Sequence, residues 1–533
     1  MGRTQQLEID GFKIWNYENA ILHKLHTMPK RKSADQPTLS FKKAKIDTPL
    51  PDNTERIDVL KDYHAEDHPF YDTLEPESLK KAVKKRAVKI SNFDDSNITD
   101  EQSTVLDELM LATSSRLVTG EAGCGKTFVQ MSLIKHLKEA QANVHRIGPT
   151  HGSIANLPND SSTYQTFFAM PPATDYLNTA LRSKHVKDMK SAALRQGFIQ
   201  RAKHRQGQST LIIEEAGMIS AEVIELIFDT LESIAAGKFR VFLFFDILQL
   251  VPVDGALLIE SDVVKAIPAL VLRTNMRQTG DEGDFLDLLR NIAKNCMDES
   301  HYEMLKSRVV KSVDAQSNKP ARRLCARNVT VTTHNLAHLN GLEKKPIYTF
   351  HALDLAVKKI PDYDLARSPK TLSWGIGAKV VFESTPLHEV GLYNGITGTI
   401  TDMVKTDTEL VLPIIYITKY DIKVVVHPYT EEIMTEASGT TAPTVQAHRT
   451  QFPFSIAEAT TVHKVQGQTL DVPVEVDLKD MTSSGQIYTA LSRLTKFENL
   501  TIRNLPPNRF GGGMDGLRVS QAALDWCKTA GLF

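Results

Sequence analysis

The sequence predicts an α/β protein whose main part consists of two parallel-sheet domains, and three observations support this fold class. From about residue 96 onward, apolar runs of strand length alternate with amphipathic helical segments, which is typical of parallel sheets covered by helices. The stretch GEAGCGKT, residues 120–127, satisfies the phosphate-loop (Walker A) pattern between a predicted strand and a predicted helix. A second strand-and-helix pattern in the C-terminal half indicates another sheet of the same kind.

The composition is that of a globular chain with several domains. At 533 residues the chain exceeds one ordinary hydrophobic core, and its 41% hydrophobic and 24% charged residues are typical of soluble proteins. No apolar run reaches the roughly eighteen residues of a membrane-spanning helix, so we expect no membrane association. The four cysteines lack disulfide or zinc spacing, which suits a reducing compartment. Because the formal net charge is -1, any nucleic-acid contact must come from a local basic groove.

The phosphate loop predicts nucleotide binding. Its glycines lack a Cβ, so the backbone can adopt left-handed angles and direct successive amides at one anion. The N-terminus of the following helix adds partial positive charge. Lys126 would then reach the β- and γ-phosphates, and the Thr127 hydroxyl would hold the magnesium ion that accompanies the nucleotide. We therefore expect ATP and Mg²⁺ as cofactors, with the loop contributing Gly120, Glu121, Ala122, Gly123, Cys124, Gly125, Lys126 and Thr127.

Polar residues follow further predicted strands, at the positions where a phosphate-loop ATPase keeps its catalytic groups. Glu214 and Glu215 come directly after the apolar run in STLIIEEAGMI. In such enzymes the first acid orients magnesium through water, and the second polarises the attacking water. The strand FRVFLFFD ends at Asp246 and leads to Gln249, whose amide can hydrogen-bond the γ-phosphate and sense hydrolysis. The planar guanidinium of Arg277, in LRTNMRQ, suits a transferring phosphoryl group.

Two other segments contribute candidate binding residues. The helix predicted over ITDEQSTVLDELM places Gln102 at its start, where its amide can read the donor and acceptor edges of adenine. The strand in NVHRIGPT ends at Pro149, Thr150 and His151, where a parallel sheet meets its ligand.

Basic residues are concentrated in two regions. Residues 1 to about 95 are predicted to form a mostly disordered polar tail, with basic clusters at 30–32 and 42–45. These clusters suit nuclear-import signals, and equally a solvated charged surface, so nuclear and cytoplasmic localisation both stay open. An insertion at about 165–208 is rich in Lys and Arg, which favours phosphate contact over the alternative of a solvated helical face.

The ordered motifs resemble those of superfamily-one helicases, most closely the PIF type (petite integration frequency), with RecD-like helicases next. The similarity runs from about residue 96 to 505, and TVHKVQGQTLD and YTALSRL are its most specific parts. The chain departs from the family where Glu214 replaces the usual Asp, and where Thr163-Tyr164-Gln165 replaces Thr-Ile-His. The resemblance is carried by DEQ, GEAGCGKT, GPTHGSIAN, LIIEEAGMI, FFDILQLVPV, LRTNMRQ, ATTVHKVQGQTLD and YTALSRL.

The resemblance implies two RecA-like domains that share one ATP site. Gln102 would read adenine, Glu215 would be the catalytic base, and Gln249 would couple the nucleotide site to the DNA site. Arg277 and Arg493 would reach the γ-phosphate from the second domain. The predicted DNA-binding residues are Pro149, Thr150, His151, Thr461, His463 and Lys464.

The expected domain organisation follows the change in the pattern of predicted strands, helices and turns along the chain. In the second sheet domain we expect strands over TVTTHN, AEATTV, VPVEVDL and NLTIRNL, and helices beginning near His463 and Gln486. Short β-rich runs with turn signals, among them AKVVFES, TGTITDMV, PIIYITKY and IKVVVHP, predict an inserted small barrel whose family counterpart is SH3-like. The expected boundaries are 1–95 for the tail, 96–275 for RecA-like domain 1A, 276–344 with 451–533 for RecA-like domain 2A, and 345–450 for the barrel, 2B.

The function that we expect is ATP-driven translocation along single-stranded DNA, coupled to duplex unwinding. The resemblance implies 5′-to-3′ polarity and roles in DNA replication, recombination and repair. Expected partners are single-stranded and tailed duplex DNA and replication or repair proteins, around a monomeric core. An RNA-acting superfamily-one helicase and a nucleotide-dependent DNA-binding switch without unwinding stay open as alternatives. A small-molecule kinase is disfavoured by the second sheet domain and the TVHKVQGQT stretch.

Overall fold

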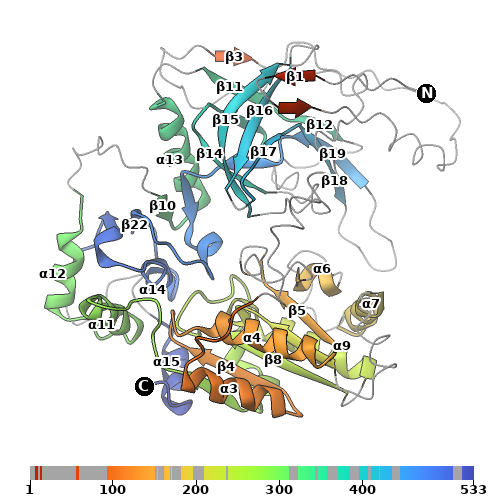
Figure 1. Ribbon diagram of the computed structural model, residues 1–533, viewed down its shortest axis with the longest axis vertical. Coiled ribbons are helices and arrows are strands. Elements are labelled where there is room, and N and C mark those ends of the chain that lie inside the picture. The colour runs from red at the N-terminus through yellow and green to blue at the C-terminus, as the bar shows by residue number, and fades with distance from the viewer. Residues whose placement is uncertain are drawn as a thin grey trace, which may run out of the picture. The chain divides into compact units, whose positions relative to one another are not determined.

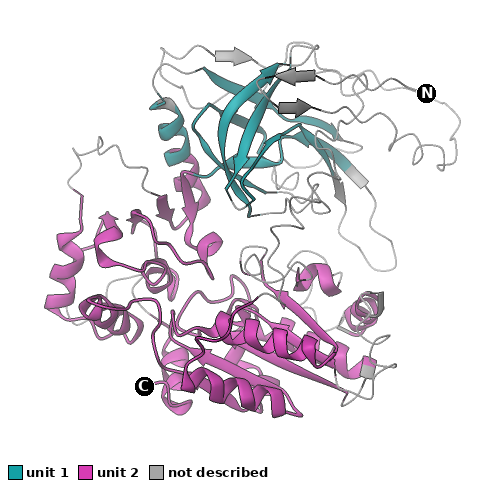
Figure 2. Cartoon of the chain, viewed as in Figure 1, with its two compact units in different colours: residues 1–86, 334–457 teal, residues 87–333, 458–533 magenta. Residues whose placement is uncertain are grey.

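The computed structural model describes most of the chain from residue 93 onward. Within these residues, no helix is both long and apolar enough to cross a membrane. The chain divides into two compact units: unit 1 comprises 1–86 and 334–457, and unit 2 comprises 87–333 and 458–533 (Figure 2). The described residues are 93–150, 153, 161–168, 170, 182–195, 209–235, 238–310, 322–342, 346–356, 369–383, 395–405, 410–418, 420–434, 445–507 and 519–533, with three short strands between residues 7 and 58.

A six-stranded parallel sheet forms the larger part of unit 2. Its strands are β4 (Arg116–Gly120), β5 (Val144–Gly148), β6 (Ser162–Thr163), β7 (Ser209–Ile213), β8 (Phe239–Phe245) and β9 (Ala269–Leu272). They lie in the order β6-β5-β7-β8-β4-β9, so the strand that leads into the phosphate loop is flanked by β8 and β9. The predicted strands in NVHRIGPT, STLIIEEAGMI and FRVFLFFD are therefore confirmed.

Helices cover both faces of this sheet. On one face, Phe242 and Phe244 of β8 pack with α3 (Asp100–Leu111) and α4 (Lys126–Glu139). On the other face, Leu243 packs in a separate cluster with α9 (Ala221–Ala235). Side chains of a strand alternate between the two faces of a sheet, so a run as apolar as FRVFLFF requires both faces to be covered. Figure 1 shows α3, α4 and α9 around β4 and β8.

A smaller parallel sheet completes unit 2. It consists of β10 (Arg322–Cys325), β21 (Ala459–Thr461), β22 (Val474–Asp477) and β23 (Leu500–Arg503), in the order β21-β10-β22-β23. Its buried Leu324, Val476 and Ile502 belong to the same core cluster as Leu243 of the larger sheet. The strands predicted over AEATTV, VPVEVDL and NLTIRNL are confirmed, as is the helix that begins at Gln486, α14 (Gln486–Leu491).

Two details of the second sheet differ from prediction. TVTTHN is helical, because it lies inside α13 (Asn328–Asn340), and the strand that precedes it is β10. The β-branched Val and Thr residues favour strands only weakly, and here Thr332 and Thr333 direct their hydroxyls to the carbonyls of Asn328 and Val329, one helical turn earlier. Near His463 the chain forms the short 3-10 helix η7 (Val462–Val465) in place of an α-helix.

Unit 1 is rich in short strands, as predicted, and most of them pair in antiparallel fashion. Five of them, β14 (Lys379–Phe382), β15 (Thr397–Lys405), β16 (Val411–Ile417), β17 (Ile422–Val425) and β20 (Phe454–Ile456), form a sheet in the order β17-β16-β15-β14-β20. A register shift between Ile400 and Asp402 interrupts the pairing of β15 with β16. The core beneath contains Trp374 and Phe452, whose ring centroids lie 4.7 Å apart.

Further strands of unit 1 form smaller sheets. β12 (Leu353–Ala356), β19 (Val445–Gln451) and β18 (Tyr429–Met434) pair in that order, and β13 (Thr371–Trp374), β11 (Ile347–His351) and β3 (Arg56–Asp58) form another sheet. β1 (Leu7–Ile9) pairs with β2 (Phe12–Ile14). Apart from these strands and residues 93–95, the predicted tail lies outside the described residues, and so do the basic clusters at 30–32 and 42–45.

The remaining elements of unit 2 surround the sheets. Within the predicted basic insertion, α7 (Arg182–Arg195) packs against α9, and residues 196–208 lie outside the described part. Lys190 of α7 donates to the Ser233 carbonyl at 2.6 Å, so this basic side chain contacts the protein itself. The other helices are α6 (Tyr164–Phe168), α10 (Asp262–Lys265), α11 (Gly283–Ala293), α12 (Glu299–Ser307) and α15 (Gln521–Thr529), with 3-10 turns η4 (Ala216–Met218), η5 (Leu258–Glu260) and η8 (Phe497–Asn499).

Candidate active site

The phosphate loop connects β4 to α4 and has the backbone that the motif predicts. Gly123 and Gly125 have φ of 89° and 82°, in the left-handed region that favours glycine. A Cβ on Gly123 would lie 2.8 Å from the Cβ of Arg277, and one on Gly125 would collide with the Gln102 amide nitrogen. Both positions therefore require glycine for conformation and for space.

Lys126 begins α4 and turns its side chain back over the loop. Its Nζ donates to the carbonyls of Gly120 at 2.7 Å and Glu121 at 2.9 Å, and lies 3.7 Å from Sγ of Cys124. Burial opposes its charge, but the acidic groups around it, Cys124 and Asp246 foremost, raise the pKa of Lys126 above its usual value. A protonated amine is thus held within the loop that would surround a phosphate.

Thr127 and Glu214 form the oxygen-rich corner of the site. The Thr127 hydroxyl donates to Oε1 of Glu214 at 2.8 Å. Glu214 directly follows β7 and is 4% exposed, and its Oε2 has no hydrogen-bond partner among the described residues. Burial and the neighbouring Glu215 carboxylate raise the pKa of Glu214 well above its usual range. A buried carboxylate oxygen of this kind, beside a hydroxyl, is the hard donor set that Mg²⁺ prefers.

Glu215 is held in an unusual backbone conformation. Its φ is 49°, which for a residue with a side chain typically costs on the order of 1–3 kcal/mol and is found in turns and at functional sites. Its Oε2 accepts a hydrogen bond from Nε2 of Gln466 at 3.2 Å, and a Cβ on Gly467 would lie 3.4 Å from its Oε1. The carboxylate of the larger sheet therefore lies against the segment that follows β21 of the smaller sheet.

Gln249 lies beyond the end of β8, close to Asp246. Its Nε2 donates to Oδ2 of Asp246 at 2.8 Å, while Oδ1 of Asp246 accepts from the Leu248 amide at 3.1 Å. Gln249 is 3% exposed, and its Oε1 has no partner among the described residues. The Asp246 carboxylate therefore fixes the orientation of the Gln249 amide and leaves the Oε1 atom of this residue available to accept a hydrogen bond.

The two predicted arginines lie at the contact between the sheets of unit 2. Arg277 is on the segment after β9 and donates from Nη1 to the Ser492 carbonyl at 2.6 Å. Arg493, which is 1% exposed, donates from Nε to the Thr489 carbonyl at 3.1 Å. Neither guanidinium forms an ion pair with a carboxylate in the described part of the chain. Burial, with the charge of Arg493, lowers the pKa of Arg277 to about 9, so the pair provides an environment that favours an anion.

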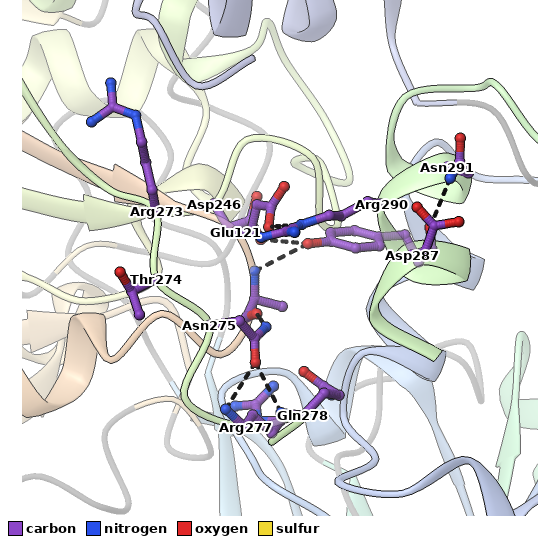
Figure 3. Close-up of polar contacts among 12 residues, drawn as sticks. Glu121, Asp246, Arg273, Thr274, Asn275, Arg277, Gln278, Asp287, Arg290 and Asn291 are labelled. Atoms are coloured by element: carbon purple, nitrogen blue, oxygen red, sulfur yellow. Dashed lines mark hydrogen bonds and ion pairs between the residues drawn. The ribbon is translucent and has the colours of Figure 1, made fainter. Parts of the chain in front are cut away.

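The segment that carries Arg277 is fastened to the phosphate loop (Figure 3). Nδ2 of Asn275 donates to the Ala122 carbonyl at 2.9 Å, while its Oδ1 accepts from the amides of Arg277 at 2.9 Å and Gln278 at 2.8 Å. Beside them, Nε of Arg290 on α11 lies 2.8 Å from Oε2 of Glu121. A variable position of the loop is thus tied to a neighbouring helix by a half-buried ion pair.

Gln102 lies at the phosphate loop. Its Nε2 donates weakly to the Cys124 carbonyl at 3.4 Å, and its Oε1 accepts from the Thr99 amide at 3.2 Å. In return, the Thr99 hydroxyl accepts from the backbone N–H of Gln102, so the two residues form a capping box at the start of α3. The side chain of Gln102 is therefore held in place against the loop.

The predicted DNA-binding residues come from both sheets of unit 2. Thr150 follows β5, and its Oγ1 accepts from the Ser153 amide at 3.1 Å. His463 and the exposed Lys464 lie in η7, and burial lowers the pKa of His463. A Cβ on Gly467 would lie 3.7 Å from Cα of Ser153, which places the two segments side by side. The others are Pro149, beside Thr150, Thr461, at the end of β21, and His151, which lies outside the described residues.

Several contacting residues were not singled out from the sequence. Asn275 and Gln278 lie in LRTNMRQ, Gln466 in TVHKVQGQTLD and Tyr488 in YTALSRL. The motifs therefore indicated that these segments are functional, but not which of these side chains make contacts. Nε2 of Gln278 donates to the Leu494 carbonyl at 2.5 Å, which joins two of these motifs. Arg290 had no local signal, because its partner Glu121 is far away in the sequence.

Taken together, the fold and the site define a P-loop nucleoside triphosphatase with two RecA-like sheets. A family model described as an AAA domain matches residues 97–312. This match covers the phosphate loop, the two glutamates and Arg277.

Comparisons with individual proteins narrow the class further. The chain is 26% identical over 427 residues to the ATP-dependent DNA helicase Pif1 of Campylobacter jejuni, covering 76% of this chain and 92% of that protein. It is 24% identical over 435 residues to the ATP-dependent DNA helicase PIF1 of Rattus norvegicus, covering 77% of this chain and 62% of that protein. The chain thus spans about three fifths of the length of the vertebrate relatives it matches.

Solved structures agree in fold. The crystal structure of the Pif1 helicase from Candida albicans matches with a TM-score of 0.67 and 23% identity, over 81% of this chain and 99% of that one. Bacteroides Pif1 bound to single-stranded DNA matches with a TM-score of 0.62 and 21% identity, over 82% and 97%. The relatives named here, at about 25% identity over most of the chain, and the structures of similar fold are all Pif1 helicases.

Proposed function

We propose that this protein is an ATP-dependent DNA helicase that translocates along single-stranded DNA in the 5′-to-3′ direction and unwinds tailed duplexes. One observation carries the proposal: Glu215, which follows a strand of the larger sheet, is contacted by Gln466 of the segment that also holds His463 and Lys464. A site built in this way can link hydrolysis to the grip on a strand. The relatives named ATP-dependent DNA helicase, and the Bacteroides Pif1 solved with ADP-AlF3 and single-stranded DNA, support the same activity.

ATP binding falls to the phosphate loop and its neighbours. Lys126 would give up its carbonyl contacts in favour of the β- and γ-phosphates, and the loop amides would surround the β-phosphate. Gln102 would contact adenine. Thr127 and Glu214 would hold Mg²⁺, since the Thr127 hydroxyl already contacts Oε1 of Glu214 and the buried Oε2 has no partner among the described residues. The bound ion would supply positive charge that offsets the charge of the phosphates.

Hydrolysis depends on the residues that surround the γ-phosphate position. Glu215 would accept a proton from the attacking water. Its backbone conformation and its contact with Gln466 would keep the carboxylate oriented for this step. Arg277 and Arg493 would stabilise charge on the transferring group, since Arg277 is half-buried, Arg493 is buried, and neither has a carboxylate partner in the described chain. Gln249 would report the state of the phosphate through its Oε1 atom.

The protein would hold DNA without recognising its base sequence. The proposed path runs along Pro149, Thr150, His151, Thr461, His463 and Lys464, at the ends of β5 and β21. We assign 96–275 as RecA-like domain 1A, 276–344 with 451–533 as RecA-like domain 2A, and 345–450 as an SH3-like domain 2B, with 1–95 as a mostly disordered basic and polar tail. The antiparallel sheet of unit 1 supports the SH3-like assignment. Nuclear localisation and replication or repair partners are also proposals.

Strand displacement tests the proposal most directly. The protein is incubated with ATP, Mg²⁺ and duplexes that carry a 5′ or a 3′ single-stranded tail, and Lys126→Ala serves as the inactive control. We expect release of the strand from the 5′-tailed duplex and ATPase stimulation by single-stranded DNA. Stronger stimulation by RNA would favour the RNA-acting alternative. Stimulated hydrolysis or binding without displacement would favour a nucleotide-dependent switch.

A further inference from the structure

Tyr488 of α14 connects the smaller sheet to the phosphate loop. Its ring is almost completely buried, with 3% of the residue exposed. The Ala122 amide of the phosphate loop donates to its hydroxyl oxygen at 3.0 Å, and the hydroxyl lies 3.4 Å from Oδ2 of Asp246. One hydroxyl from α14 thus contacts both the loop that binds nucleotide and the carboxylate at the end of β8 (Asp246 and Glu121 are labelled in Figure 3).

The chemistry of these groups fixes the direction of the hydrogen bonds. Burial, with the nearby carboxylates of Asp246 and Glu121, raises the pKa of Tyr488 well above its usual value, so the hydroxyl keeps its proton. The Ala122 amide can only donate, so the single Tyr488 proton is directed to Asp246. The order of donors and acceptors therefore runs from the phosphate loop through Tyr488 to Asp246.

Asp246 passes this constraint to Gln249. The same Oδ2 atom that Tyr488 approaches also accepts from Nε2 of Gln249 at 2.8 Å. Backbone packing reinforces the link, because Gly485, at the N-terminus of α14, lies against the carbonyls of Leu248 and Gln249 with no room for a Cβ. The position of α14, the Asp246 carboxylate and the orientation of the Gln249 amide are therefore interdependent.

We propose that Tyr488 is a positioning residue that couples the backbone of the phosphate loop to the orientation of Gln249, acting through Asp246. The inference rests on the proposed function, because it concerns how the same site senses its nucleotide. A shift of the Ala122 amide on nucleotide binding changes the hydrogen bond that Tyr488 accepts. The Tyr488 hydroxyl then changes its donation to Asp246, and the Gln249 amide reorients toward or away from the γ-phosphate position.

The test removes only the hydroxyl. In Tyr488→Phe the ring still fills its buried site, while Ala122 and Asp246 each lose one hydrogen-bond partner. We expect kcat for DNA-stimulated ATP hydrolysis to fall about ten- to hundredfold, with KM for ATP changed less than about threefold. Tyr302→Phe is the matched control, since its hydroxyl donates to the Pro506 carbonyl at 3.2 Å in the same unit. Its kinetics should equal those of the wild type.

A double-mutant cycle distinguishes coupling from a general structural role. If Tyr488 acts through Asp246 on Gln249, adding Tyr488→Phe to Gln249→Ala should cost less than about a further twofold in kcat. Losses that multiply would overturn the inference, as would a wild-type kcat for Tyr488→Phe or a thermal midpoint lowered together with KM. These outcomes leave the proposed function standing, provided that wild-type protein unwinds tailed DNA. Absence of DNA-stimulated ATPase in the wild type would instead reject the proposed function, and this inference with it.

Discussion

Nε2 of Gln466 donates a hydrogen bond to Oε2 of Glu215 across 3.2 Å, although the two residues are 251 positions apart in the sequence. Glu215 follows β7 in the larger sheet of unit 2, and Gln466 ends the η7 turn after β21 in the smaller one. Gln466 is 3% exposed, so the contact is shielded from water. The orientation of the carboxylate therefore depends on the position of a segment that also presents Lys464 to solvent.

Gln466→Ala should weaken the response of hydrolysis to DNA. The substitution removes the donor that orients Glu215, and we expect the DNA-stimulated kcat to fall about tenfold. ATPase rates at increasing concentrations of single-stranded DNA measure this. Gln468→Ala is a matched control, because its amide donates to the Lys464 carbonyl at the surface. Equal effects of the two substitutions would contradict the role assigned to Gln466.

Glu215→Gln should abolish turnover and preserve binding. The amide keeps the shape of the side chain but cannot accept the proton of the attacking water, so we expect kcat to fall by at least about a hundredfold. Fluorescent nucleotide and DNA titrations should give near wild-type affinities. Retained turnover would remove Glu215 from the role of catalytic base.

Glu214→Gln should stabilise the nucleotide-free protein at alkaline pH. Because the folded-state pKa of Glu214 is raised, the wild type loses stability as the pH rises from the unfolded value, about 4.3, through the folded value. Glutamine does not ionise and escapes this loss. Thermal midpoints without Mg²⁺ should therefore diverge in favour of the variant as the pH rises. Mg²⁺-dependent nucleotide binding should weaken in the same variant, and equal midpoints at every pH would argue against a buried acid.

Arg493→Ala should slow hydrolysis far more than it weakens DNA binding. Arg493 is buried with its hydrogen bonds directed at the carbonyls of Thr489 and Gln468 and the hydroxyl of Ser492, and its charge is attracted by the carboxylates of Glu215 and Asp246. We expect kcat to fall about a hundredfold or more. Single-turnover kinetics and DNA titrations separate the two effects, and the opposite pattern would place Arg493 on the DNA path.

DNA affinity should fall steeply with added salt. A protein that holds a strand through its phosphates releases counterions, so we expect a loss of about tenfold or more between about 50 and 200 mM salt. Fluorescence anisotropy with a labelled single strand measures the slope. A flat response would count against a phosphate-tracking groove.

Local patterns predicted much of the fold and the identity of the chemical groups. The phosphate loop, the glutamates after β7 and the strands of both sheets are local signals, because each depends on neighbouring residues. The strand prediction for TVTTHN was wrong because the strand propensity of Val and Thr is a weak signal. In the helix, the hydroxyls of Thr332 and Thr333 hydrogen-bond to carbonyls one turn earlier. The contacts of Ala122 with Tyr488, 366 positions apart, could not be predicted, since only folding brings them together. The domain boundaries and the roles of the individual site residues remain predictions.

Asn275 joins the phosphate loop to the segment that carries Arg277. Its single side chain holds the Ala122 carbonyl with one end and the amides of Arg277 and Gln278 with the other. Asn275 therefore links the phosphate loop directly to the segment that carries the Arg277 cation. If Arg277 acts on the γ-phosphate as proposed, Asn275 would keep it aligned with the phosphate loop, and domain movement would have to occur elsewhere in the chain.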